Sequence, residues 1–365
     1  MTWLLLAWAL LALGVTLTAL VRTRRAAPAT AVRADALHPV VVLRPFDVPS
    51  PQELANLSTP LPPGVRQIVL SPFRPRLPAG VEWLPSDPPR QNRKLGHLHY
   101  ALSVLSSPES EGAASDEVDF PHSPLQRVLI VDADVRLDDA LLSDLLGALD
   151  QGADAAWASP RPEAAGLSRG LLVQSLHSFD VLDVISAGPK TVCGKALALG
   201  PAALELFRAL PDCVGEDLEL GVKLAEARLE VRLAGHARVP GADASLTASL
   251  ARFTRWMQVL RAHRPTLFPT VPLFFACTPL LLAFALASAN VAVLGAVLLV
   301  AALRTVLAAK LEDTARPTFW WLGGEALLLA AWLGSLVRGR VVEWRGRRLV
   351  LGAGGVLVPA LRRAS

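Results

Sequence analysis

The stretch Val128-Leu129-Ile130-Val131-Asp132-Ala133-Asp134-Val135-Arg136 decides the fold, because four consecutive apolar residues lead directly into two carboxylates. A short apolar run bounded by polar residues is typical of a strand buried in a parallel sheet. At the mouth of such a sheet, Asp132 and Asp134 can hold Mg²⁺ or Mn²⁺ against a diphosphate, because hard cations prefer carboxylate oxygen. The alternative interpretation is a strand end whose acids are solvated and cap a helix from Asp138.

Outward from this stretch, short apolar runs alternate with helical patterns between residues 22 and 265. The alternation favours an α/β fold with parallel strands and helices on both faces of the sheet, in which ligands bind beyond the carboxyl ends of the strands. The predicted strands are Val40–Leu43, Arg66–Leu70, Val128–Val131 and Ala153–Ala158. The predicted helices are Pro51–Leu57, Arg93–Leu105, Asp139–Leu149 and Ala164–Ser186, and Ser106–Ser123 is predicted to be a surface loop.

Acidic residues at the start of a later helix form the second signal, Gly215-Glu216-Asp217. Acids at this position can simply stabilise the positive end of the helix. The functional alternative is a general base, because an acceptor hydroxyl is a poor nucleophile unless a carboxylate takes its proton during attack.

Two basic motifs complete the set. Arg252 and Arg255, followed by Trp256, share one face of a helix that leads to apolar sequence, and two guanidinium groups can hold a diphosphate. The alternative is a basic helix that meets lipid headgroups. Asn92 and Lys94 open another helix, where phosphate can bind.

Apolar segments at both ends of the chain predict an integral membrane protein. Trp3–Val21 contains 19 uncharged residues, and the Arg22-Thr23-Arg24-Arg25 cluster after it indicates an uncleaved anchor with the following chain in the cytoplasm. Residues 267–303 are long enough for two helices that turn near Ser288-Ala289-Asn290. In the third segment, 319–337, Glu325 is expected to face protein or water.

The side of the C-terminal tail is left open by the sequence. Three spans after the soluble part would place the tail outside, yet its arginines belong inside, so one segment is predicted to be re-entrant or interfacial. The predicted organisation is an anchor at residues 1–22, a catalytic domain at 38–264, membrane segments at 267–337 and a basic cytoplasmic tail at 338–365.

Composition narrows the class of protein. Hydrophobic residues make up 52% of the chain and mean hydropathy is +0.40, which is high for a fully soluble protein. A net charge of +4, scattered along the chain, does not indicate a nucleic-acid partner. The three cysteines have neither disulfide nor metal-ligand spacing, which favours free thiols in a reducing compartment.

Taken in order, the strand-end acids, the Glu216-Asp217 pair, the arginine–tryptophan motif and the membrane segments resemble the glycosyltransferase family 2 superfamily. The likeness is closest to family 21-like enzymes, the ceramide glucosyltransferases and bacterial hopanoid-type lipid glycosyltransferases. It also covers the anchor, Leu43-Arg44-Pro45, Asn92-Arg93-Lys94, Ile185-Ser186-Ala187, the Gly194 turn and the tail from Glu343 to Leu349.

The resemblance implies a GT-A fold and transfer of one sugar to a membrane lipid in the bacterial inner membrane. It makes Asp132 and Asp134 the site of Mg²⁺ or Mn²⁺ and of the diphosphate, and Asp217 the catalytic base. It further implies that Asn92, Lys94, Arg252, Arg255 and Trp256 bind the donor. The donor implied is a nucleotide sugar, UDP-glucose or UDP-N-acetylglucosamine.

One departure from the family concerns recognition of the nucleotide base. The family has an aspartate just after the second strand, whereas this chain has Ser71 there and no acid before Arg74. Two alternatives stay open. A processive polysaccharide synthase would share the same motifs, but it needs more helices for a translocation channel. The missing aspartate near Ser71 motivates the other alternative, a catalytically inactive membrane scaffold.

Overall fold

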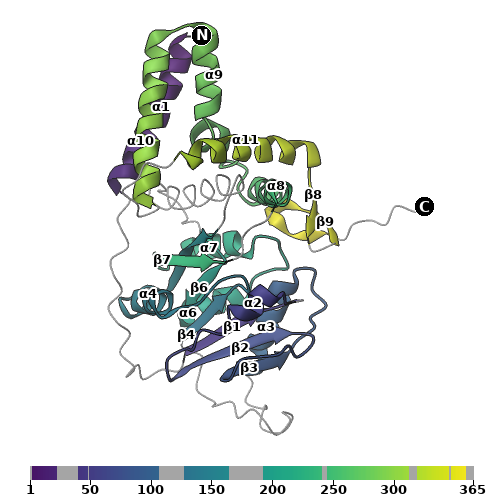
Figure 1. The fold of residues 1–365 in the computed structure, drawn as a ribbon. Helices are drawn as coiled ribbons and strands as arrows, with labels where there is room; N and C mark the ends of the chain where they lie inside the picture. The colour runs from purple at the N-terminus through teal and green to yellow at the C-terminus, as the bar shows by residue number, and fades with distance from the viewer. Residues whose placement is uncertain are drawn as a thin grey trace, which may run out of the picture. The chain divides into compact units, whose positions relative to one another are not determined.

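A computed structural model describes residues 2–22, 40–47, 49–106, 127–163, 192–240, 245–311, 319–344 and 347–358. The predicted helix Ala164–Ser186 and nearly all of the predicted loop from Ser106 lie outside these residues. The contacts divide the chain into two compact units (Figure 1). The sheet unit contains described residues 40–161 and 192–240, and the helical unit contains α1 and the described residues from 245 onward.

Within the described residues, the sheet unit is built on a sheet of strand order β3-β2-β1-β4-β6-β5-β7. β1 is parallel to β2 and β4, and β2 is parallel to β3, whereas β6 is antiparallel to β4 and β5. The predicted α/β class with a mainly parallel sheet is confirmed. The bounds are β1 Val40–Pro45, β2 Val65–Ser71, β3 Val81–Pro85, β4 Arg127–Val131, β5 Ala155–Pro162, β6 Ala196–Leu199 and β7 Val231–Val239.

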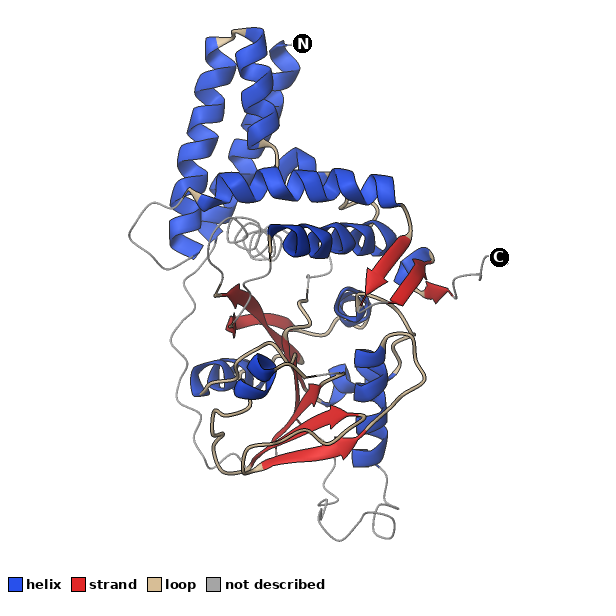
Figure 2. Ribbon diagram, turned by 45° about the vertical axis from the view of Figure 1, so that its right-hand side comes forward, coloured by secondary structure: helices blue, strands red, loops and turns tan. Residues whose placement is uncertain are grey.

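Helices cover both sides of this sheet (Figure 2). Local sequence explains their starts: Ser50 and Glu53 form a capping box at α2, and Asp138 accepts a hydrogen bond from the Leu141 amide at α4. Since Asp138 caps α4 by itself, that helix does not need Asp132 or Asp134 as a cap. The bounds are α2 Pro51–Ala55, α3 Arg93–Ser106, α4 Asp139–Asp150, α6 Pro201–Arg208 and α7 Glu216–Glu226.

The helical unit combines apolar helices with a small antiparallel sheet of order β10-β9-β8. Among the described residues, three helices are long and apolar enough to cross a membrane: α1, α10 and α11. α9 is a shorter apolar helix, and α9 and α10 meet at the predicted turn, where Ala289 has a φ of +49° and the Asn290 side chain caps α10. The bounds are α1 Thr2–Arg22, α8 Leu246–His263, α9 Thr278–Ser288, α10 Val291–Leu311, α11 Trp320–Arg338, β8 Val341–Trp344, β9 Arg347–Leu351 and β10 Leu357–Val358.

α1, α9 and α10 lie side by side, whereas α11 runs across them and along α8 (Figures 1 and 2). Buried residues from all three helices of the bundle, among them Ala9, Leu281 and Val297, form one apolar cluster. α1 and α10 run in the same direction, since Thr16 contacts Arg304 and Lys310 Nζ donates to the Leu20 carbonyl at 2.7 Å. The C-terminal ends of α1 and α10 therefore lie at the same end of the bundle.

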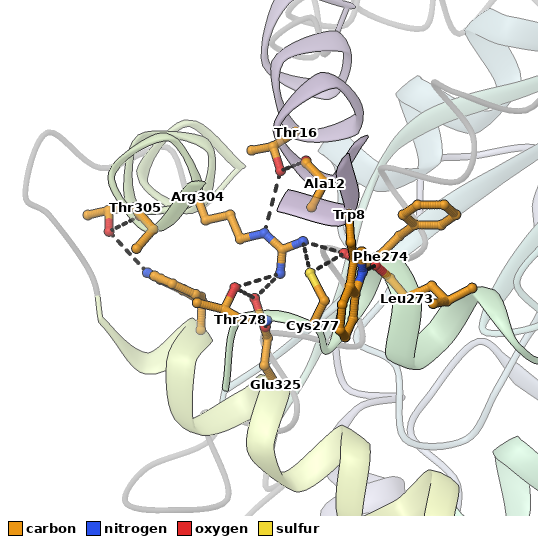
Figure 3. A network of polar contacts seen from close by, with 12 residues as sticks. Trp8, Ala12, Thr16, Leu273, Phe274, Cys277, Thr278, Arg304, Thr305 and Glu325 are labelled. Carbon is orange, nitrogen blue, oxygen red and sulfur yellow. Dashed lines mark hydrogen bonds and ion pairs between the residues drawn. The ribbon is translucent and has the colours of Figure 1, made fainter. Parts of the chain in front are cut away.

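A charged pair is buried at that end of the bundle, formed by Arg304 of α10 and Glu325 of α11 (Figure 3). All five guanidinium N–H groups of Arg304 have acceptors, which are Glu325, the Phe274 carbonyl and the side chains of Thr16, Cys277 and Thr278. The second oxygen of Glu325 accepts from the Thr278 amide at 2.9 Å. Glu325 faces protein, as the sequence predicts, and the network connects α1, α9, α10 and α11 with the short helix Val271–Phe275 before α9.

Candidate active site

Four segments of the sheet unit converge beyond the carboxyl end of β4. Val131 of β4 is in register with Ala196 of β6, and the Asp132 amide donates to the Lys195 carbonyl at 2.9 Å. Because β6 is antiparallel to β4, its first residues lie beside the last residues of β4. The amino ends of α3 and α7 complete the cluster with Lys94 and Glu216.

Lys94 makes contacts with three other members of this cluster. Its ammonium contacts Asp132 Oδ1 at 2.7 Å and Glu216 Oε1 at 2.8 Å, and it donates to the Gly194 carbonyl at 2.9 Å. Its side chain is only 17% exposed. Burial lowers the pKa of Lys94, but the attraction of Asp132 and Glu216 prevails and holds it well above its usual value. Lys94 therefore stays charged and joins the strand-end acids to α7.

Lys195 bridges the two strand-end acids. Its ammonium lies 2.7 Å and 2.8 Å from the two oxygens of Asp134 and 3.1 Å from Asp132 Oδ2. Burial raises the pKa of Asp132, but Lys94 and Lys195 together lower it to about 2. Both strand-end carboxylates thus converge on a single position, and Asp132 is ionised at any physiological pH.

Asp217 lies in the first turn of α7 and contacts the backbone of Gly194. Its Oδ2 accepts from the Gly194 amide and its Oδ1 from the Leu218 amide, each at 2.9 Å. Burial and then the neighbouring charge of Glu216 raise the pKa of Asp217. A Cβ atom at Gly194 would lie 3.1 Å from Lys94 Nζ and 3.3 Å from Asp217 Cβ, so only glycine allows this approach without a shift.

Asn92 contacts the cluster through Glu216. It is fully buried, and its Nδ2 donates to the Cys213 carbonyl and to Glu216, while its Oδ1 accepts from the Leu95 amide. Asp212 in turn accepts from the amides of Gln91 and Asn92. Asn92 therefore caps the start of α3 and contacts Glu216, and its contact with a donor stays a prediction.

The turn that carries the two acids rests on Arg44, a fully buried residue of β1. Arg44 donates to the Val135 carbonyl at 2.8 Å, and the Ala133 carbonyl accepts from Asn56 at 3.2 Å. Burial lowers the pKa of Arg44 to about 10, although Asp134 and Asp132 act to raise it. The sequence singles out Arg44 only through the family resemblance, whereas the structure places it under the acidic turn.

The arginine–tryptophan motif lies on α8 of the helical unit. Arg255 donates to the Glu343 carbonyl of β8 at 3.4 Å, and the rings of Phe253 and Trp256 lie 4.8 Å apart. Arg252 is partly exposed on the same helix. The structure thus brings together Asn92, Lys94, Asp132, Asp134 and Asp217 in one unit, and holds Arg252, Arg255 and Trp256 in the other.

Ser71, which stands where the family has an aspartate, is buried at the end of β2. Its hydroxyl donates to the Phe73 carbonyl at 2.8 Å and accepts from the Trp83 indole at 3.1 Å. Both hydrogen bonds are internal to the sheet unit, so the position supports β2 and β3.

The donor set at Asp132 and Asp134 fits a divalent cation. Lys195 demonstrates the fit, because one positive centre reaches oxygens of both carboxylates within 3.1 Å. In the part of the chain that the structure describes, no cluster of three or more histidine, cysteine, aspartate or glutamate side chains could hold a metal. Two carboxylates with the remaining positions left to phosphate and water is the arrangement that Mg²⁺ commonly adopts.

The sequence predicts four charged site residues of this cluster, Lys94, Asp132, Asp134 and Asp217, but not Lys195. The signal available for it is weak: a lysine directly after the Gly194 turn, with no motif of its own. Its importance comes from the antiparallel pairing of β6 with β4, which no local pattern encodes.

The chain matches one family of known proteins and has limited similarity to several solved structures. The model of a family described as glycosyl transferase family 21 matches residues 120–357. No curated protein matches the chain. Among solved structures, the mannosyltransferase PcManGT from Pyrobaculum calidifontis, in complex with GDP-Man and Mn²⁺, is similar at 18% identity and a TM-score of 0.49, over 91% of this chain and 99% of that chain.

A second similar structure is glucosyl-3-phosphoglycerate synthase from Mycobacterium tuberculosis, in complex with Mn²⁺, uridine diphosphate and phosphoglyceric acid. It is 14% identical with a TM-score of 0.35, over 61% of this chain and 79% of that chain.

Proposed function

The chain belongs to glycosyltransferase family 21, and on that premise we propose that it transfers a single sugar from a nucleotide sugar to a hydroxyl of a membrane lipid. The donor is UDP-glucose or UDP-N-acetylglucosamine, and the acceptor is a lipid such as ceramide or a hopanoid. The observation that supports this most strongly is the cluster of Lys94, Asp132, Asp134 and Asp217 beyond the carboxyl end of β4.

The proposed reaction is a single displacement. The lipid hydroxyl oxygen bonds to the anomeric carbon while the bond from that carbon to the diphosphate oxygen breaks, and the nucleoside diphosphate leaves. Asp217 takes the hydroxyl proton as the bond forms, and its raised pKa suits a base because proton affinity increases with pKa. Since attack and departure occur on opposite faces, an α-linked donor gives a β-linked product.

Asp132 and Asp134 are the residues that would hold Mg²⁺ or Mn²⁺. When bound, the ion supplies positive charge to the departing diphosphate. Lys94 adds a fixed positive charge beside Asp132, and lysine binds phosphate as a point charge. We extend the proposal to Arg252, Arg255 and Trp256 as ligands of the same diphosphate, on the strength of the motif alone.

We further propose that the chain is a multi-pass protein of the bacterial inner membrane with its catalytic unit in the cytoplasm. The arginines after α1 place the end of that helix inside, and α10 ends at the same end of the bundle. α11 crosses the bundle at this end, so it lies along the interface and the arginine-rich tail stays in the cytoplasm. This arrangement removes the conflict between three spans and a basic tail.

The test of the function is transfer from radiolabelled UDP-glucose and UDP-N-acetylglucosamine into membranes that contain the protein. A discrete labelled species in the organic phase, lost in Asp217→Asn, supports a lipid acceptor. Label confined to high-molecular-weight or water-soluble product would replace the proposal with a polysaccharide synthase. If neither phase is labelled, with GDP-sugars included as further donors, the scaffold alternative would stand.

A further inference from the structure

Lys195 occupies the position between the two acids that would hold the metal. Within the described residues, its ammonium contacts only Asp132 and Asp134, at distances of 2.7 Å to 3.1 Å. A divalent ion bound to the same oxygens would place two positive centres side by side. The ion and this ammonium therefore exclude each other between these carboxylates, because like charges repel strongly in a partly buried site.

Lys94 differs from Lys195 in the partners it would keep. If Asp132 turned to a metal ion, the Lys94 ammonium would still contact Glu216 at 2.8 Å and the Gly194 carbonyl at 2.9 Å. Lys195 would keep no acidic partner that the described residues supply. Of the two lysines, Lys195 is thus the one that must find a new anion when a metal ion enters.

The backbone of Lys195 limits where that anion can be. Its carbonyl accepts from the Asp132 amide at 2.9 Å, and Ala196 pairs with Val131, so the Cα atom is fixed at the edge of the acidic turn. The side chain is 21% exposed, so it has access to the solvent side of the cluster. A diphosphate held through a metal ion at Asp132 and Asp134 would offer the displaced ammonium a new anion.

We propose that the Lys195 ammonium occupies the metal position before ligands bind. When a metal ion and the nucleotide bind together, this ammonium moves to the donor's diphosphate. The proposal rests on the proposed function and adds an order of binding to it. The metal alone is held weakly because it must displace the ammonium. The metal with a diphosphate is held tightly because the displaced ammonium gains an anion.

The test is the affinity for Mn²⁺, measured by electron paramagnetic resonance of the free ion, with and without UDP, in wild-type protein and in Lys195→Met. The variant should bind Mn²⁺ alone at least about tenfold more tightly than wild type, because no ammonium competes. With UDP present, its advantage should vanish or reverse. The strengthening of Mn²⁺ binding by UDP is a coupling, and it should be smaller in the variant by at least the same factor.

Two results would overturn the proposal: equal affinities of both proteins for Mn²⁺ alone, or equal coupling to UDP. Lys195→Arg, which keeps the charge, should behave like wild type in the absence of nucleotide. Lys223→Met is the matched control, because Lys223 pairs with Glu226 on the exposed face of α7. Circular dichroism of each variant separates a loss of fold from a change of site.

These measurements do not depend on sugar transfer, so they separate this proposal from the proposed function. If the Mn²⁺ affinities change as expected but no lipid is labelled, the proposed movement of Lys195 stands and the lipid acceptor is rejected. Lipid labelling with unchanged Mn²⁺ affinities would do the opposite.

Discussion

Asp217 illustrates what one residue contributes to this site. The carboxylate is held by two backbone amides, so its orientation is fixed before any substrate arrives. Its role as base is predicted from the Glu216-Asp217 motif, and a fixed orientation is what that role requires.

Replacing Asp217 by asparagine should abolish transfer while leaving donor binding nearly intact. The amide keeps the shape of the side chain but cannot accept the proton, and general base catalysis contributes roughly 10²–10⁴ in rate. The measurements are the initial rate of transfer and the affinity for UDP. Asp139→Asn, at an exposed acid of α4, is the control. A rate within about tenfold of wild type would remove Asp217 from the base role.

The rate should also decline toward acidic pH as Asp217 becomes protonated. Burial and the charge of Glu216 raise the pKa of Asp217 above 3.8, so the decline should begin above that pH, whereas Asp132, with a pKa of about 2, stays ionised. Glu216→Gln removes a negative neighbour, so the acid limb of kcat/KM should move to lower pH. An unmoved limb, or one that moves upward, would assign the titration to another group.

At the scale of secondary structure, the sequence predicts several strands and helices of the sheet unit. The strands that it does not predict share one cause. The predicted strands at Val40, Arg66 and Val128 and the helices at Arg93 and Asp139 are confirmed to within two residues, because each has a clear apolar run or cap. β3, β6 and β7 carry mixed or short patterns, and tertiary pairing selects them. The position of Lys195, directly before β6, therefore cannot be predicted from local sequence.

The buried pair in the helical unit gives a prediction about stability. Arg304→Met should lower the thermal midpoint of detergent-solubilised protein strongly, because Glu325 would remain buried without its partner. Glu325→Leu in the same background should restore much of the loss, since both charges are then absent. Arg338→Met, at an exposed end of α11, is the control. A double variant no more stable than the single one would contradict this explanation, because the loss would then not come from the unpaired charge of Glu325.

At the scale of the whole chain, membrane segments are predictable from composition, but their paths are not. α1, α10 and α11 are all long and apolar enough to cross a membrane, with a mean hydropathy of 2.4 for α1 and α10 and 1.3 for α11, yet α11 lies across the others. The reason is a set of specific contacts: Glu325 pairs with Arg304, and Gln258 of α8 donates to the carbonyls of Gly339 and Val341. Hydropathy records none of these.

The proposed topology can be tested with single cysteines at Glu226, Ala289 and Val358, all exposed positions. In intact spheroplasts an impermeant maleimide should label only Ala289→Cys, at the turn between α9 and α10, and opening the cells should expose the other two. The native cysteines are buried, and burial raises the pKa of Cys193 and Cys213 to about 12, so background labelling should be low. Labelling of Val358→Cys in intact cells would mean that α11 spans the membrane.

The parallel contact of α1 with α10 has a consequence for biosynthesis. The two helices are separated by roughly 270 residues, so at about 5–20 residues per second α1 waits in the bilayer for roughly 15 to 55 seconds before α10 follows. It can wait alone, because the Thr16 hydroxyl donates to the Ala12 carbonyl of its own helix. Arg304 cannot: it leaves the ribosome as an unpaired charge, and its acidic partner on α11 is made afterwards. Nascent chains stopped before α11 should therefore be recognised as unfinished and degraded faster than full-length protein in a pulse–chase experiment, and Arg304→Met should protect them.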